Sequence, residues 1–128
     1  MKESCLRGTA MLEAVLMKLK DALPGARIIP APSAFLTDTA VYRYFPGKSG
    51  GRRKSGRLEV RFVSPSLAGA MAMYGSARSA LVSEADFDRV GTGLRAVHVE
   101  EVAEGSSCGY IRKSGLYFVK SGFLLTGY

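Results

Sequence analysis

The chain has few of the side chains that build metal centres, disulfide frameworks and nucleophilic catalytic sites. Its 128 residues include only two cysteines, Cys5 and Cys108, and one histidine, His98. Two distant cysteines and one histidine do not match the ligand sets of zinc or iron sites. One cysteine pair does not make a disulfide framework, so the cysteine content fits a reducing, cytosolic setting.

Enzyme mechanisms that use histidine find little support in the sequence. His98 lies in an apolar stretch typical of a strand, where we expect a packed structural role, and no G-x-S-x-G nucleophile elbow accompanies it. Glu100 and Glu101 are adjacent on the same predicted strand, so their side chains point to opposite faces and do not form an acid–base pair. A nuclease-like metal site using Asp38 and Glu59 is a weak alternative. We expect no enzymatic activity, no cofactor and no metal.

Long hydrophobic runs are also absent. The early acid Glu3 and the lack of a following apolar run predict that there is no signal peptide. Residues 62–77 carry no charge, but they contain Pro65, two glycines and several serines. They fall short of the ~20 mostly apolar residues that a membrane span needs. The composition, 47% hydrophobic and 23% charged, indicates an ordinary globular chain, which we interpret as a single α+β domain over residues 1–128.

The uncharged stretch predicts an unusual helix over residues 66–82. Its core-facing stripe is expected to consist of apolar residues at helical spacing: Leu67, Ala70, Met71, Met73, Tyr74, Ala77 and Leu81. The opposite side carries only small uncharged residues, where a helix on a water-exposed surface normally carries lysine and glutamate. We interpret this side as a self-association face, with these candidate residues: Gly69, Ala72, Gly75, Ser76 and Ser79. The alternative is an Ala/Gly/Ser surface on a monomer.

Charge is distributed unevenly along the chain, whose net charge is +7. Residues 43–61 contain seven cations and one acid, a net of +6, whereas residues 84–104 contain six acids and two arginines, a net of −4. Such a chain can attract polyanions through its basic segment, or join the two segments between copies of itself.

The remaining periodicity predicts an α+β fold with the order α-β-β-α-β-β. A first helix is expected to start at a Thr9 cap and to end at Pro24, with residues 1–8 as a loosely ordered extension. Four strands are expected, at residues 39–45, 57–63, 94–102 and 116–126, and the last of them is expected to carry a bulge at Gly122. A short additional strand at 27–30 is the alternative to a loop there. Together they would form a four- to five-stranded, mainly antiparallel sheet with both helices packed on one face. Cys108 is expected in a loop.

A basic hairpin, expected to be flexible over residues 47–56, joins two of these strands. Its candidate contacts for a polyanion or a partner are Lys48, Arg52, Arg53, Lys54 and Arg57. Arginine, lysine and glycine suit contact with phosphates, but no aromatic residue is present to stack on a base. A solvated tip without a ligand, or a tip that docks onto the acidic segment of another copy or onto another protein, remains an alternative.

The succession of elements resembles the tail terminator and tail-completion (minor capsid or head–tail joining) proteins of long-tailed bacteriophages and prophages. The resemblance covers residues 11–128. It rests on a first helix ending in Leu-Pro-Gly, the strand VYRY at 41–44, a variable hairpin, LEVRFV at 58–63, an Ala-rich helix and a closing strand that begins GLYFV at 115–119. No catalytic motif contributes to it.

The resemblance implies a structural subunit without a cofactor. Such a subunit forms a homo-oligomeric ring, commonly of six copies, that caps the tail tube and docks to the head connector, with DNA passing through its centre. It would be cytoplasmic during assembly and then part of the virion. The alternative is a small basic nucleic-acid-binding module that acts through residues 48–57.

Overall fold

The computed structural model describes residues 2–30, 38–47, 54–82, 87–88 and 96–127. These residues form two helices and six strands. In chain order they are α1 (Lys2–Ala22), β1 (Arg27–Pro30), β2 (Thr39–Pro46), β3 (Lys54–Ser64), α2 (Leu67–Leu81), β4 (Phe87–Asp88), β5 (Ala96–Ile111) and β6 (Leu116–Gly127).

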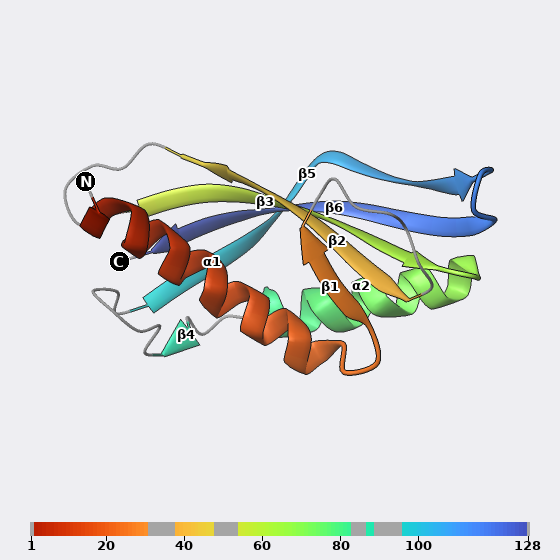
Figure 1. The fold of residues 1–128 in the computed structure, drawn as a ribbon, viewed down its shortest axis with the longest axis horizontal. Coiled ribbons are helices and arrows are strands. Elements are labelled where there is room, and N and C mark those ends of the chain that lie inside the picture. Colours follow the sequence, from red (N-terminus) through yellow and green to blue (C-terminus); the bar gives the residue numbers. More distant parts are fainter. Residues whose placement is uncertain (1, 31–37, 48–53, 83–86, 89–95, 128) are drawn as a thin grey trace.

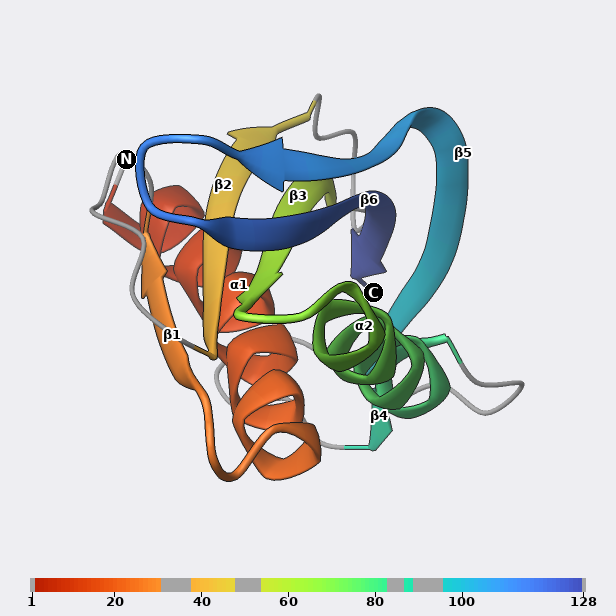
Figure 2. The same ribbon diagram turned by 90° about the vertical axis from the view of Figure 1, so that its right-hand side faces the viewer.

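The strands form one twisted sheet in the order β1-β2-β3-β6-β5-β4, with both helices on the same face (Figures 1 and 2). Only β1 and β2 pair in parallel; the other neighbours are antiparallel. The predicted α+β class is confirmed. The sheet has more strands than predicted, because the two-residue β4 was missed and the short β1 is present. Both lie at the edges of the sheet, where few residues are needed to extend it.

Strand β3 carries the alternation that its sequence predicts. Leu58, Val60 and Phe62 are fully buried against the helices, whereas Arg57 and Arg61 point to the opposite face. On β6 the residues at 117, 119, 123 and 125 share the helix-covered face, as expected, and Phe123 and Leu125 are fully buried. The core therefore lies between this face and the two helices, and it includes Val15, Leu19, Ala77 and Leu81 from the helices.

Helix α2 begins where the sequence predicts. The side-chain oxygen of Ser66 accepts a hydrogen bond from the backbone N–H of Gly69 at 3.0 Å, which is an N-cap. The predicted core stripe is wrong at two positions, because Leu67 is 42% and Met71 49% exposed. The helix rests on the sheet through Ala70, Ala77 and Leu81, and Met71 lies about 100° around the axis from Ala70.

Other boundaries differ from the prediction. Helix α1 begins at Lys2, so Thr9 lies inside it and does not cap it, and residues 2–8 continue the helix instead of forming a separate extension. Strand β5 runs to Ile111, which places Cys108 in a strand and not in a loop. The irregularity in register lies between Val102 and Ser107 on β5, not at Gly122, which pairs regularly with both of its neighbours.

Candidate functional site

The side of α2 that faces away from the sheet is exposed and uncharged. We call it the α2 outer face, and it consists of Ala68, Ala72, Gly75, Ser76 and Ser79. Four of the five predicted self-association residues belong to it; the fifth, Gly69, is half-buried. The exposed Leu67 and Met71 add apolar surface on the same helix. Coverage of the α2 outer face by a second copy stays a prediction.

The two glycines of α2 have different surroundings. A Cβ atom on Gly69 would lie 2.3 Å from the Ser64 side-chain oxygen and 3.2 Å from the Ser64 Cβ. Ser64 is buried, and its hydroxyl donates a hydrogen bond to Asp38 at 3.2 Å. A Cβ atom on Gly75 would meet no heavy atom within 4 Å. Gly69 therefore allows α2 to approach the end of β3, whereas nothing within the described subunit explains the glycine at position 75.

Alanine substitutions at these glycines are expected to differ in sign. Gly75→Ala should raise the free energy of unfolding by about 0.5–1 kcal/mol, because alanine favours the helix and meets no neighbour here. Gly69→Ala should instead lower the free energy of unfolding, because Ser64 must move and break its bond to Asp38. Urea unfolding of both variants measures the difference. Equal stabilisation by both would contradict the close approach at Gly69.

A polar cluster fixes the rotation of α2 on the sheet. The Glu101 carboxylate on β5 accepts hydrogen bonds from the Tyr74 hydroxyl, from the Ser121 hydroxyl at 3.3 Å and from Arg78 Nε at 3.3 Å. Burial, and then the hydrogen bond to Glu101, raise the pKa of the Tyr74 phenol above its ordinary value. Because Tyr74 and Arg78 are held towards β5, the α2 outer face is turned away from the sheet.

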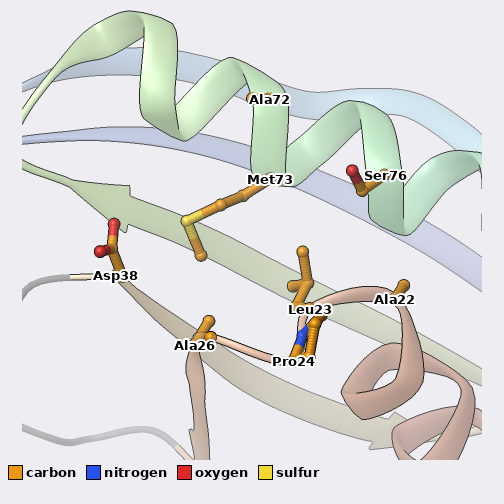
Figure 3. Close-up of a pocket in the computed structure, with 9 residues that line it drawn as sticks. Ala22, Leu23, Pro24, Ala26, Asp38, Ala72, Met73 and Ser76 are labelled. Carbon is orange, nitrogen blue, oxygen red and sulfur yellow. The ribbon is translucent and has the colours of Figure 1, made fainter.

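A shallow groove runs between α2 and the end of α1 (Figure 3). Its volume is about 280 Å³, and it is lined by Ala22, Leu23, Pro24, Gly25, Ala26, Asp38, Ala72, Met73 and Ser76. Ala72 and Ser76 belong to the α2 outer face, so that face continues into the groove. A second hollow of about 420 Å³ lies beside β1, lined by Lys20, Leu23, Pro24, Ala26, Arg27, Ile28 and Ile29. Neither hollow gathers several polar groups around one point, as a catalytic or small-molecule site would.

The opposite face of the sheet, which no described helix covers, is rich in cations. We call it the uncovered sheet face. Arg43 and Arg61 are exposed there and Arg57 is half-buried. The guanidinium of Arg61 lies 5.5 Å from the centre of the Phe118 ring. Lys120 on β6 is paired with Glu59 on β3 at 3.4 Å, so these two charges neutralise each other.

The predicted basic contacts fall only partly within the described residues. Lys48, Arg52 and Arg53 lie outside them, and Lys54 is described only as the first residue of β3. Arg57 is on the uncovered sheet face, but the neighbouring Arg43 and Arg61 were not among the predicted contacts. The sequence pattern could have identified Arg61 as a further contact, because Arg57 and Arg61 occupy alternate positions of β3 and therefore share a face.

The residues weighed as catalytic or metal-binding do not come together. The ring of His98 lies 3.1 Å from the Glu100 carboxylate on the uncovered sheet face, and it is only half-buried, so the expected packed role is wrong. Glu100 and Glu101 point to opposite faces, as predicted. Asp38 bonds to Ser64 and lines the groove beside α2, whereas Glu59 pairs with Lys120 on the other face. Among the described residues, no three carboxylate, histidine or cysteine side chains gather as metal ligands.

Comparison with known proteins finds a match among solved structures. No protein-family model and no curated protein matches this chain. Among solved structures, the fold is similar to a chain of a structure described as the virion of a native gene transfer agent (GTA) particle. The two share 14% sequence identity with a TM-score of 0.61, over 94% of this chain and 96% of that chain. In the part of the chain that the structure describes, neither helix has the length and hydrophobicity to cross a membrane. The match shows a common fold over nearly the whole of both chains.

Proposed function

We propose that this chain is a structural protein of a phage-like particle: a ring-forming tail terminator or head–tail joining subunit that caps the tail tube and docks to the head connector. The observation that carries the proposal is the match to a chain of a GTA virion, which extends over 94% of this chain. The sequence resemblance to phage tail-completion proteins supports the same class.

The surfaces of the subunit also suit an assembling protein. The exposed and uncharged α2 outer face, bordered by Leu67 and Met71, offers apolar area that a neighbouring copy can bury. A surface that meets a different surface on the next copy generates a ring when the rotation closes. The proposed partners are therefore further copies of this chain, the tail-tube and connector proteins, and DNA passing through the ring. The proposed role needs no catalysis, and the protein would be made in the cytoplasm and incorporated into the virion.

Electron microscopy of particles from a strain that lacks this protein tests the proposal. We expect heads without joined tails, or tails of uncontrolled length, and recovery of normal particles when the full chain is supplied in trans. Particles with normal tail length and normal head attachment in the deletion strain would refute the proposed role. A monomer in dilute solution would not, because a ring can form on the growing tail alone.

A small nucleic-acid-binding module is the second candidate, favoured by the exposed Arg43 and Arg61 on β2 and β3, the two strands that the basic hairpin joins. It predicts binding of duplex DNA that weakens steeply with salt, because each phosphate contact releases counterions. Alanine at Arg52, Arg53 and Lys54 together should flatten the salt dependence by about one unit of slope per lost contact. Binding that the triple variant leaves unchanged would exclude this candidate.

A further inference from the structure

Strand β5 is open along its outer side in the half that leads to the hairpin turn (Figure 2). On that side its neighbour is β4, which pairs only with residues 96–97. Further along, none of the described residues pairs with this side of β5. After a register irregularity, residues 107–111 pair regularly with β6, and Cys108 and Tyr110 are exposed. We call residues 107–111 the open β5 edge.

The open β5 edge lacks the features that normally keep an edge strand from pairing with another chain. Folded proteins keep edge strands very short, or place charged residues, proline or a bulge on them. The opposite edge of the sheet follows this rule, because β1 has four residues and ends in Pro30. Residues 107–111 read SCGYI, without charge or proline. Their outer backbone groups are therefore suited to pairing with an added strand.

The turn after β5 indicates which backbone groups point outwards. The carbonyl oxygen of Ile111 accepts a hydrogen bond at 2.8 Å from the N–H of Gly115, which leads into β6. Successive residues of a strand direct their N–H and C=O groups to alternate sides. The groups of Gly109 therefore point to β6, whereas those of Cys108 and Tyr110 point outwards.

An exposed aromatic side chain lies beside these outward groups. The ring of Tyr110 is on the helix-covered face, where its centre lies 4.9 Å from the centre of the Tyr117 ring. Tyr110 is 53% exposed. A strand added to the open β5 edge would cover part of this ring, so apolar burial would add to the backbone hydrogen bonds.

A second copy of this chain presents a matching strand, because its own open β5 edge is uncharged and has the same outward groups. The direction of pairing follows from the turn, where Arg112 and Lys113 are exposed. Antiparallel pairing keeps these cations at opposite ends of the contact, whereas parallel pairing would bring the cations of both copies together. Antiparallel pairing of identical strands is a two-fold, self-complementary contact.

We infer that two copies associate through the open β5 edge, in an antiparallel pair centred on Gly109, the midpoint of residues 107–111. In this register Cys108 lies opposite Tyr110 of the second copy, and their outward N–H and C=O groups bond to each other. The contact joins two six-stranded sheets into one. A two-fold contact closes on itself, so it does not build a ring. The inference therefore goes beyond the proposed function and concerns subunits in solution.

Two charge variants test the register in the full-length protein. Cys108→Lys with Tyr110→Lys, the Lys–Lys variant, places like charges opposite each other on both sides of the centre. Cys108→Lys with Tyr110→Glu, the Lys–Glu variant, changes the same two side chains but places opposite charges there. The matched control is Met17→Lys with Phe45→Lys, which adds two cations at exposed apolar positions on α1 and β2.

Sedimentation equilibrium over rising protein concentration measures the association, and circular dichroism checks that each variant is folded. The wild type and the control should form a dimer of the same strength. The Lys–Lys variant should associate at least about tenfold more weakly than the Lys–Glu variant, because like charges directly opposite in a sheet repel and opposite charges attract.

A disulfide trap tests the same register without added charge, in protein that carries Cys5→Ser. Tyr110→Cys puts a thiol opposite Cys108 of the second copy, at a Cα distance of about 5.5 Å that a disulfide spans. We expect a covalent dimer on mild oxidation. Cys108 alone lies diagonal to Cys108 of the second copy, about 7–8 Å away, and should form little covalent dimer.

The inference is overturned if the wild type stays monomeric at every concentration, or if the Lys–Lys and Lys–Glu variants associate equally. It is also overturned if oxidation links Cys108 as readily without the change at Tyr110. The deletion strain separates these results from the proposed function. Normal particles there refute the virion role and leave the dimer standing, whereas a particle defect together with a monomeric wild type refutes only the dimer.

Discussion

Replacement of Phe123 by alanine is expected to lower the free energy of unfolding by about 3–5 kcal/mol, the usual loss for a large aromatic side chain in a packed core. Phe123 is fully buried on β6, and its ring belongs to the core that joins the sheet to both helices. The truncation leaves a cavity that the surrounding side chains fill only in part. Urea or thermal unfolding followed by circular dichroism measures the loss.

The neighbouring residue provides the control. Leu124→Ala removes an apolar side chain from the same strand, but Leu124 lies on the uncovered sheet face and is 40% exposed. We expect a loss of less than about 1 kcal/mol, because little buried area disappears. Comparable losses at both positions would mean that the uncovered sheet face is buried within the subunit, and that the helices do not define the only core.

Arginine on the α2 outer face is expected to abolish assembly without unfolding the subunit. Ala72→Arg and Ser79→Arg each place a long charged side chain at an exposed helical position, where it costs the subunit at most about 0.5 kcal/mol. If a neighbouring copy packs on this face, each variant buries an unpaired charge, which costs about 3–5 kcal/mol. That loss corresponds to a weakening of the contact by a factor between about 10² and 10⁴.

Recovery of normal particles in the deletion strain, counted by electron microscopy, provides the measurement. Met17→Arg serves as the matched control, because Met17 is 66% exposed on α1 and lies outside the α2 outer face. The control should restore particles as the wild type does, and the two α2 variants should not. Restoration by Ala72→Arg and by Ser79→Arg would show that this face is open to solvent in the assembled protein.

The strands of the central sheet follow directly from the sequence pattern. The alternation of Leu58, Val60 and Phe62 with charged residues predicts one buried and one open face, and the structure has both. A second helix starting near residue 66 and a hairpin formed by β2 and β3 were predicted as well. These features depend on local periodicity and on capping chemistry, which are contained in short stretches of sequence.

The features that the sequence did not predict depend on contacts between distant segments. The rotation of α2 is set by Glu101 on β5, which holds Tyr74 and Arg78, so Leu67 and Met71 lie at the flank of the helix and not in the core. Residues 103–111 have the glycine and serine content of a loop, yet all of them belong to β5, and residues 107–111 pair with β6. Neither result can be obtained from the periodicity of one segment.

The candidate surfaces were predictable to different degrees. The small-residue side of α2 follows from helical spacing, and four of its five predicted residues are exposed. The separation of basic and acidic segments follows from the sequence alone, but their positions in the sheet do not. Only the strand order, with β6 inserted between β3 and β5, places Arg57 and Glu100 in one row across the same face.

Electron cryomicroscopy of the assembled particle, at a resolution that separates helices, tests most directly whether this chain is a virion subunit that contacts its own copies. We predict several copies of this fold in a closed ring at the end of the tail tube, with the α2 outer face covered in every copy. Absence of the fold from the particle, or an α2 outer face open to solvent in all copies, would contradict the prediction.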